Sequence, residues 1–333
     1  MPDGSLPTAA QERVHVEIHL GPGDRREALR RDVLEGLTRT PKSLPPKWFY
    51  DERGSELFDE ITRLPEYYLT RREREILAER AGEIAERTHA ATLVELGAGT
   101  SEKTRFLLDA LVAEGSLRRY AAIDVSDETL RESALRIAAE YPSIGVHAVV
   151  GDLERHLDRL PVDGRRLVAF LGSSIGNFPP AARSAFLELL RSGLGDGDAL
   201  LLGLDLVKAR ERLEAAYDDA AGVTAEFNRN ILAVVNRELG ADFVLERFAH
   251  VARWDADNEW VELALRSLDE RVVRIRELRL EVEFTRDELL HTEISAKFRR
   301  ERAEPELERA GFEPAAWWTD AAGDFALSLS LAV

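Results

Sequence analysis

The most constraining feature of this 333-residue chain is the stretch TLVELGAGTSEKT, which occupies residues 92–104. Residues 92–96 are apolar enough to be buried on both faces, which is typical of a strand in a parallel sheet. Gly97 and Gly99 predict a tight turn that leaves room for a ligand close to the backbone. A strand, a glycine turn and a helix in this order form the first third of a nucleotide-binding α/β unit.

The residues around this turn narrow the choice of nucleotide. A dinucleotide fingerprint needs a third glycine where this chain has Glu102, which weighs against a nicotinamide oxidoreductase. Glu95 and Glu102 also add negative charge where a pyrophosphate would approach. We therefore expect a cationic or uncharged ligand, such as the sulfonium and amino group of S-adenosylmethionine. The alternative is a glycine turn that connects strand to helix and binds nothing.

Short apolar strands alternate with helices after this motif. This alternation predicts an α/β fold with a parallel, doubly wound sheet. The antiparallel pair of strands expected at the C-terminus resembles the one that completes the sheet of class I Rossmann-like methyltransferases. Right-handed crossovers would bring the carboxyl ends of the strands to one rim, where ligands bind. The further strands are expected at residues 120–123, 146–150, 167–171 and 199–204, with helices at 128–140 and 181–192.

Polar residues follow the predicted strands at this rim. Asp124 closes the second strand, where a carboxylate can accept both ribose hydroxyls, and Asp152 closes the third, where it can accept from an adenine amino group. An ordinary cap or turn aspartate is the alternative for each. The loop that begins at Gly172 contains Asn177, whose amide offers an acceptor and a donor that do not titrate. This loop resembles the one by which many amine methyltransferases hold the target nitrogen, although their residue order is not kept.

Two aromatic loops precede the predicted core, and an insertion follows it. The first loop has Tyr50 near its end, and the second contains Tyr67. Together they suggest either a substrate wall or a packed domain edge. Thr70 and Glu73 form a capping signature for the next helix. From residue 208 the alternation changes to helices followed by antiparallel strands, and Thr285 to Glu288 repeat a capping signature before an expected short helix. Residues 291–298 are expected to be extended.

Two polar residues of this extended stretch are two positions apart. Glu293 and Ser295 therefore project to one face of the strand. The alternative is an exposed strand edge with polar residues outward.

Composition excludes several classes of function. The net charge of -17 weighs against binding to nucleic acid or to an anionic membrane. The chain has no cysteine, which excludes disulfides, thiolate nucleophiles and cysteine-ligated zinc. No apolar run is long enough to span a bilayer, and the N-terminus lacks the features of a signal peptide, so we expect a cytoplasmic protein. His15 and His19 have helical spacing and are expected to be surface residues, without a bound metal.

Several longer stretches carry a resemblance to one family. They are PKSLPPKWFYD, GSELFDEITRLPEYY, LVELGAGTSEKT, FLGSSIGN, LLLGLDLVK, YDDAAGVTAEFNRN, TEISAKF and the pair WWTD and AGDFALSL. Together they run from about residue 25 to the C-terminus. In these stretches the chain resembles the L-histidine Nα-methyltransferases of actinobacterial ergothioneine biosynthesis.

The resemblance implies an activity and its ligands. The expected reaction is the trimethylation of the α-amino group of L-histidine to hercynine, with S-adenosylmethionine as methyl donor and S-adenosylhomocysteine as product. The implied partners are small molecules, with no nucleic acid, membrane or obligate protein partner. The alternatives are an N-methyltransferase for another amino acid or amine on the same scaffold, and a non-catalytic adenosine-binding protein.

The resemblance also implies roles for individual residues. The cofactor positions are Gly97, Gly99, Lys103, Asp124, Asp152 and Leu153. The histidine-binding positions are Tyr67, Asn177, Tyr217, Glu293 and Ser295, together with Gly172 and with Leu263, which stands where relatives have a methionine in the pocket wall. Asn177 and Tyr50 are expected to hold the target amine during transfer.

The family's architecture implies two domains. A methyltransferase core is expected at 71–207 plus 297–333, and a substrate-binding domain at 19–70 plus 208–296. Residues 1–18 are expected to form a loose arm. A terminal antiparallel pair of strands is expected to complete a seven-stranded sheet.

Overall fold

The computed structural model describes residues 11–153, 155–161 and 163–333, and this part of the chain divides into two compact units. Unit 1 comprises Arg71–Leu206, Phe298–Val333 and the N-terminal segment up to Leu20. Unit 2 comprises Gly21–Thr70 and Val207–Lys297. These boundaries lie close to the predicted domain limits, except that the N-terminal segment belongs to unit 1.

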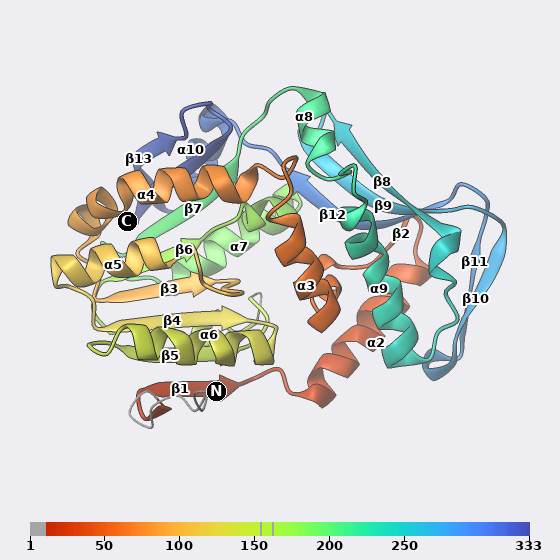
Figure 1. The fold of residues 1–333 in the computed structure, drawn as a ribbon, viewed down its shortest axis with the longest axis horizontal. Coiled ribbons are helices and arrows are strands. Elements are labelled where there is room, and N and C mark those ends of the chain that lie inside the picture. The colour runs from red at the N-terminus through yellow and green to blue at the C-terminus, as the bar shows by residue number, and fades with distance from the viewer. Residues whose placement is uncertain (1–10, 154, 162) are drawn as a thin grey trace, which may run out of the picture. The chain divides into compact units, whose positions relative to one another are not determined.

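Unit 1 is built on one eight-stranded sheet with the strand order β1-β5-β4-β3-β6-β7-β14-β13 (Figure 1). The strands from β1 to β7 in this order run parallel, while β14 pairs antiparallel with β7 and β13 antiparallel with β14. The strand bounds are β1 Val14–Ile18, β3 Thr92–Leu96, β4 Arg119–Asp124, β5 Gly145–Val150, β6 Arg166–Phe170, β7 Ala199–Asp205, β13 Phe312–Thr319 and β14 Phe325–Ala332.

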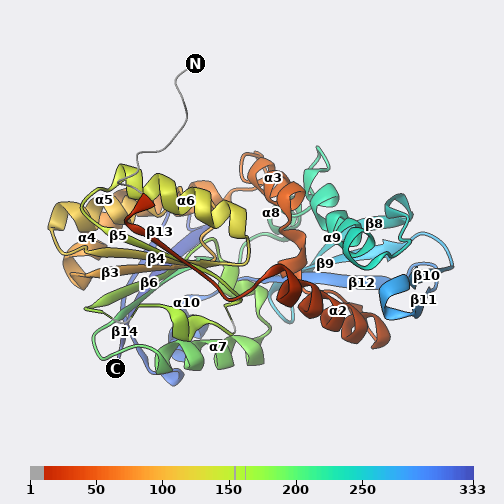
Figure 2. The ribbon, with the colours of Figure 1, turned by 90° about the horizontal axis from the view of Figure 1, so that it is seen from below.

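Helices cover both faces of this sheet. Figure 2 shows α4, α5 and α6 on one face and α7 and α10 on the other. Strands β3, β6 and β7 are buried along their whole length, because a parallel sheet covered on both faces has no solvent side. The predicted doubly wound α/β class is confirmed. The helix bounds are α4 Leu69–Thr88, α5 Arg105–Glu114, α6 Asp127–Glu140, α7 Pro180–Ser192 and α10 Arg300–Arg309.

The strand order places a topological switch between β3 and β6. From β3 the chain adds β4 and β5 on one side, then returns to the other side of β3 to add β6 and β7. In open α/β sheets, ligands bind outside the carboxyl ends of the strands at such a point. The loops that follow β3 and β6 are therefore the first place to look for a site.

The N-terminal segment differs from the expectation. Residues 14–18, predicted as part of a loose arm, form strand β1, which pairs in parallel with β5 from Val14 opposite Val146 to Ile18 opposite Val150. The sheet consequently has eight strands and not seven. The sequence V-H-V-E-I alternates apolar and polar residues, which is the pattern of a strand. The rest of the predicted arm, residues 1–10, lies outside the described residues.

Unit 2 combines helices with two small sheets. Its four-stranded sheet has the order β2-β12-β9-β8, in which β9 is antiparallel to both neighbours and β2 pairs in parallel with β12. Strand β2 belongs to Gly21–Thr70 and β12 to Val207–Lys297, so this pairing joins the two parts of unit 2. The bounds are β2 Lys42–Ser43, β8 Phe248–Asp255, β9 Trp260–Ser267, β12 Leu289–Ala296, α2 Pro22–Thr38, α3 Glu52–Ile61, α8 Arg210–Ala215 and α9 Val223–Leu239, with β10 Arg271–Ile275 and β11 Leu280–Phe284 as a separate hairpin.

One short element of unit 2 was predicted wrongly. Residues 285–288 form a turn that leads into β12 and not into a helix, and the Glu288 carboxylate accepts the backbone N–H of Thr285 at 2.9 Å. This side chain also pairs with Lys42 of β2. The capping signature therefore closes the connection from β11 to β12.

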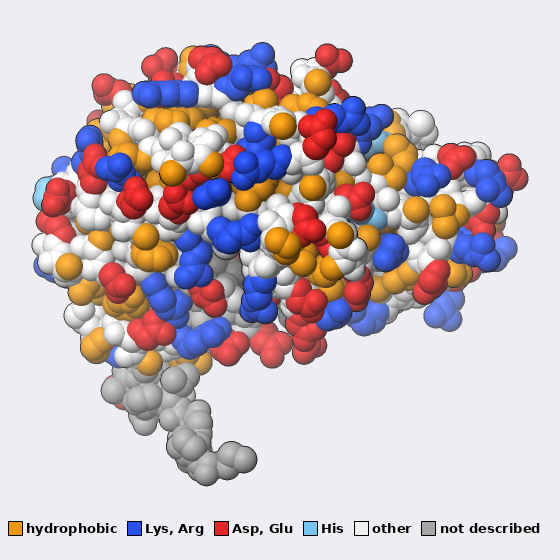
Figure 3. Space-filling model, turned by 45° about the horizontal axis from the view of Figure 1, so that its top comes forward, with side chains coloured by type: hydrophobic (Ala, Val, Ile, Leu, Met, Phe, Trp, Pro, Cys, Tyr) orange, Lys and Arg blue, Asp and Glu red, His pale blue; other side chains and the backbone are white. Residues whose placement is uncertain are grey.

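The helices and the surface charges can be compared with what a membrane-spanning or a strongly basic protein would have. Among the described residues, no helix combines the length and the hydrophobicity needed to cross a membrane. Figure 3 shows acidic and basic side chains interspersed over the face in view, with no continuous basic area.

Candidate functional site

The glycine turn after β3 leaves open space beside the backbone. Gly97 has a φ of 66° and Gly99 a φ of 50°, values that L side chains rarely adopt. A Cβ added to Gly99 would meet no atom within 4 Å. The turn is fixed to the neighbouring strand, because Gly97 N–H donates to the carbonyl oxygen of Ile123 at 2.9 Å. This combination of fixed backbone and free space suits a bound nucleoside.

Glu95 does not contribute charge on the ligand side of this turn, contrary to the expectation. Its side chain is buried and accepts hydrogen bonds from the hydroxyls of Thr104 and Tyr120. The Tyr120 hydroxyl also bonds Ser101 Oγ at 2.8 Å. Glu95 therefore holds the turn and the start of α5 from within the protein, and burial raises its pKa. Of the two expected charges only Glu102 is exposed, with 67% of its side chain accessible.

The two aspartates at the strand ends lie where they were predicted. Asp124 ends β4, and its carboxylate accepts the N–H of Gly99 at 3.0 Å and that of Ser126 at 2.9 Å. These bonds hold the carboxylate at the end of β4 beside the glycine turn. Asp152 follows β5 and precedes Leu153, and its backbone N–H donates to Nδ1 of His156 at 2.9 Å.

Glu73, which was predicted to cap a helix, instead joins the two loops at the switch point. Glu73 of α4 is fully buried, pairs with the ammonium of Lys103, and accepts the N–H of Gly172 at 2.7 Å. On β7, a Cβ at Gly203 would lie 2.1 Å from Oε1 of Glu73, so only glycine leaves room there. The predicted capping role of Glu73 with Thr70 is wrong, because both lie inside α4, which begins at Leu69.

A sequence signal for Glu73 was present. It stands at helical spacing with apolar residues that are buried, namely Leu69, Ile76 and Leu77. A lone carboxylate on the apolar face of a helix needs a partner inside the protein. Nothing in the local sequence identifies that partner as Lys103.

The loop after β6 has a constrained shape. Gly172 has a φ of 74° and Ser173 a φ of 60°, and Ser173 Oγ accepts the N–H of Asp205 at 3.0 Å. The short 3₁₀ helix η3, Ser174–Asn177, follows at once, and Asn177 is its half-buried last residue. This loop and the cofactor positions belong to unit 1.

The predicted substrate residues of unit 2 lie in a connected aromatic cluster. Tyr50 is in edge-to-face contact with Phe58 and Phe227, at ring-centroid distances of 5.6 and 5.5 Å. Phe58 contacts Tyr67, and Tyr67 contacts Tyr217, each at 6.2 Å. The structure thus brings together three tyrosines that are far apart in the sequence. Phe58 and Phe227 were not predicted as members of this group.

The cluster ends in three polar groups that bond one another. The Tyr217 hydroxyl lies 2.8 Å from Ser295 Oγ, and the buried ammonium of Lys297 donates to both oxygens at 2.8 Å. The sequence analysis missed Lys297, although the alternation that pairs Glu293 with Ser295 on one face extends to it. Leu263 of β9 stands opposite Glu293 in the antiparallel register, so these two side chains share a face.

The comparisons with known proteins agree on one family. The family model described as "Histidine-specific methyltransferase, SAM-dependent" matches residues 29–332. The histidine N-alpha-methyltransferase of Mycolicibacterium smegmatis is 58% identical over 305 residues, which cover 92% of this chain and 95% of that protein. The Mycobacterium tuberculosis protein of the same name is 55% identical over 318 residues, covering 96% and 99%. Ergothioneine biosynthesis protein 1 of Neurospora crassa is 32% identical over 292 residues, covering 84% of this chain and 32% of that protein.

Replacing Glu95 by Gln tests the buried carboxyl beneath the glycine turn. Because burial raises the pKa of Glu95 above its ordinary value of 4.5, its contribution to stability is complete below pH 4.5 and is lost as the pH rises through the raised pKa. Gln cannot ionise, so the stability of E95Q relative to the native chain should improve as the pH rises above 4.5 and level off above the raised pKa of Glu95. Urea unfolding at a series of pH values measures this difference.

The matched control is Glu102→Gln, at the exposed glutamate of the same loop. The pH dependence measured for Glu95→Gln is compared with that of this variant. A pH-independent difference for Glu95→Gln would show that the buried carboxyl does not titrate as described.

Proposed function

The chain belongs to the family of histidine-specific, S-adenosylmethionine-dependent methyltransferases, and on that premise we propose that it trimethylates the α-amino group of L-histidine to hercynine. This would be the first step of ergothioneine biosynthesis. The observation that carries the proposal is the 58% identity to a histidine N-alpha-methyltransferase over 92% of this chain and 95% of that protein. The family model's match to residues 29–332 includes parts of both units and every candidate site residue.

The methyl donor is proposed to bind unit 1 at the carboxyl ends of β3, β4 and β5. S-adenosylmethionine supplies an electrophilic methyl group on a positively charged sulfur. The open space at Gly99, the place of the Asp124 carboxylate beside that turn and the position of the switch point support this location. The residues proposed to hold the donor are Gly97, Gly99, Lys103, Asp124, Asp152 and Leu153.

The imidazole of the substrate is proposed to bind unit 2. A neutral imidazole has one N–H donor and one nitrogen acceptor. Glu293 would accept the N–H, and the hydroxyl of Ser295 would donate to the other nitrogen. Lys297 supports this assignment, because its ammonium donates to Ser295 and Tyr217 and so fixes both oxygens as acceptors toward it. Tyr67 and Leu263 would supply apolar walls.

Asn177 and Tyr50 are proposed to hold the amine. An amine nitrogen can attack the methyl group with its lone pair only when it is unprotonated. The protein must therefore position the neutral amine and exclude bulk water. The Asn177 carbonyl would accept an amine N–H, and water or a path through a tyrosine would take the proton. The N–H of Gly172 already donates to Glu73, so Gly172 would meet the substrate only through other atoms. Tyrosine rings attract a trimethylammonium by about 0.5–2 kcal/mol.

The activity test is incubation of the purified chain with S-adenosylmethionine and each of a panel of amino acids and amines, followed by mass analysis. We expect L-histidine to gain one, two and then three methyl groups, with fragmentation placing all of them on the α-nitrogen. Faster methylation of another amine would assign the scaffold to that substrate. Binding of the donor without any methylated product would overturn the enzymatic proposal.

Replacing Glu293 by Gln tests the reading of the imidazole. The loss of a charge-assisted hydrogen bond costs about 1.5–3 kcal/mol, so KM for histidine should rise roughly 10- to 100-fold. Affinity for S-adenosylmethionine, measured by calorimetry, should not change. Glu283→Gln, at an exposed position of β11 in the same unit, is the matched control and should leave both values unaltered. An unchanged KM for histidine in E293Q would remove Glu293 from the site.

Replacing Asn177 by Ala tests the transfer step. Removing a group that positions the reacting atoms typically lowers kcat about 100-fold or more. Single-turnover measurements should show this loss while donor affinity is retained. Asn258→Ala, in the exposed turn between β8 and β9, should turn over like the native chain. Native turnover in N177A would exclude Asn177 from the reaction.

A further inference from the structure

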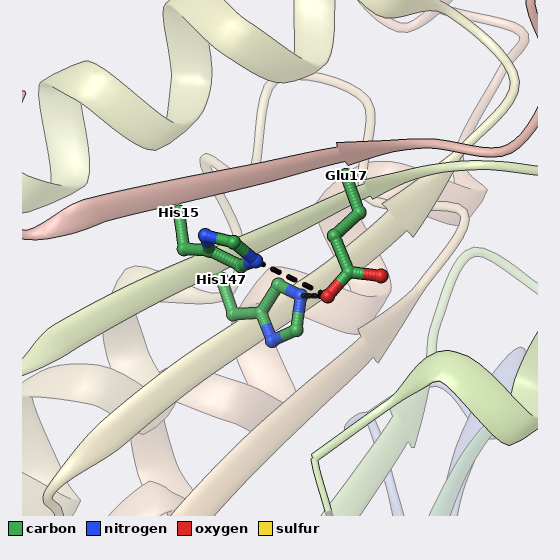
Figure 4. A group of neighbouring side chains, drawn as sticks. All are labelled: His15, Glu17 and His147. Atoms are coloured by element: carbon green, nitrogen blue, oxygen red, sulfur yellow. Dashed lines mark hydrogen bonds and ion pairs between the residues drawn. The ribbon is translucent and has the colours of Figure 1, made fainter.

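Two histidines and a glutamate converge on strands β1 and β5 of unit 1. His15 of β1 stands directly opposite His147 of β5, and Glu17 lies two residues beyond His15 on the same face. As Figure 4 shows, both rings are directed at one carboxylate. Nε2 of His15 lies 3.2 Å from Oε1 of Glu17, and Nε2 of His147 lies 3.1 Å from the same oxygen.

From this geometry we propose that His15, Glu17 and His147 bind one divalent transition-metal ion, with zinc as the reference ion. One ligand atom from each residue lies within 4.8 Å of the others. Imidazole nitrogen and carboxylate oxygen bind zinc at about 2.0–2.2 Å, which leaves ligand atoms roughly 3.3 Å apart. Two of the three separations are already close to this value, so small side-chain rotations complete the site.

The Nε2 atom of His147 gives independent support. It is buried and, among the described residues, has no hydrogen-bond partner, since its contact with Glu17 lacks hydrogen-bond geometry. A buried polar atom without a partner is costly and calls for an explanation. An ion between the two rings and the carboxylate would supply the missing partner.

A third histidine holds the carboxylate in place. Nε2 of His19 lies 2.8 Å from Oε2 of Glu17, which leaves Oε1 directed at the other two rings. Metal-binding carboxylates are commonly fixed by a hydrogen bond to their second oxygen. The His19 ring also stacks on His156 at 5.5 Å, and His156 Nδ1 accepts the backbone N–H of Asp152. The site is therefore connected to the loop after β5.

Other histidine–glutamate contacts among the residues that the structure describes lack this convergence. His89 pairs with Glu114 at 2.6 Å, and His291 pairs with Glu262 at 2.7 Å, each with a single histidine. Within the described ranges, the group on β1 and β5 is the one set of three residues with suitable spacing. Ordinary ion pairing explains the two-residue contacts but not two rings directed at one oxygen.

No metal was expected here, because His15 and His19 lie near a polar terminus and no carboxylate completes an H-E-x-x-H pattern with them. In a strand, His15 and Glu17 share a face, whereas a helix would separate them. The third member, His147, lies more than a hundred residues away and joins them only through the pairing of β1 with β5.

The ion would act as a structural clip. Strand β1 is the edge strand of the sheet. An ion ligated from both strands binds only the paired state, so it stabilises the folded chain by mass action. At a free zinc concentration about a hundredfold above Kd, the melting temperature should rise by roughly 5 °C.

The test uses the full-length chain without a histidine tag, treated with a chelator and dialysed. Zn²⁺ alone is titrated by calorimetry, and Co²⁺ is used as a spectroscopic probe whose visible absorption reports nitrogen and oxygen ligation. The variants are His15→Gln, at a side chain that is 69% exposed and removable without disturbing the fold, and His147→Gln. His89→Gln removes a histidine from a two-residue pair and is the matched control.

We expect one Zn²⁺ per native chain, with affinity reduced at least tenfold in H15Q and in H147Q and unchanged in H89Q. The rise in melting temperature should disappear in H15Q. Absence of stoichiometric binding to the native chain would overturn the proposal, as would equal binding by H15Q and the native chain. Equal loss in H89Q would show that zinc binds scattered surface histidines.

Discussion

The buried carboxylate of Glu73 is the constraint on which the nucleotide-binding side of unit 1 depends. A carboxylate without solvent is tolerated only when it is paired and hydrogen-bonded. Glu73 meets this requirement with the Lys103 ammonium and the Gly172 N–H, which belong to the loops after β3 and β6. Those are the two loops at the switch point. The need to satisfy one charge therefore fixes the separation of the loops, and Gly203 provides the room.

A second buried carboxylate acts beneath the same turn. Glu95 bonds the hydroxyls of Thr104 and Tyr120, so the strand end, the start of α5 and strand β4 are held together. Removing either carboxylate would leave several donors without partners. The glycines of the turn adopt positive φ values without strain, and the polar groups around them limit their freedom. Flexible residues thus form a fixed loop because their neighbours are fully bonded.

The strands of the core could be predicted from the sequence, but the contacts between distant residues could not. Strands β3 to β7 were predictable because apolar runs end in Gly or Asp, and Asp124 and Asp152 lie at the expected strand ends. Strand β1 was missed because the polar N-terminal segment was expected to form a loose arm, although residues 14–18 alternate apolar and polar side chains. Lys297 was within reach, since it continues an alternation already recognised. The partners of Glu73 and the meeting of His15 with His147 depend on tertiary pairing, which no local pattern encodes.

The charges around the proposed imidazole site explain how it would select its substrate. Glu293 attracts a donor, while the buried ammonium of Lys297 lies beside Ser295 and Tyr217 and disfavours a second positive charge. A cationic side chain such as that of lysine or arginine would be attracted by Glu293 but repelled by Lys297. A carboxylate side chain would be attracted by Lys297 but repelled by Glu293. A neutral ring with one donor and one acceptor satisfies both polar groups at once, and the tyrosines on either side provide the apolar surface that its carbon atoms need.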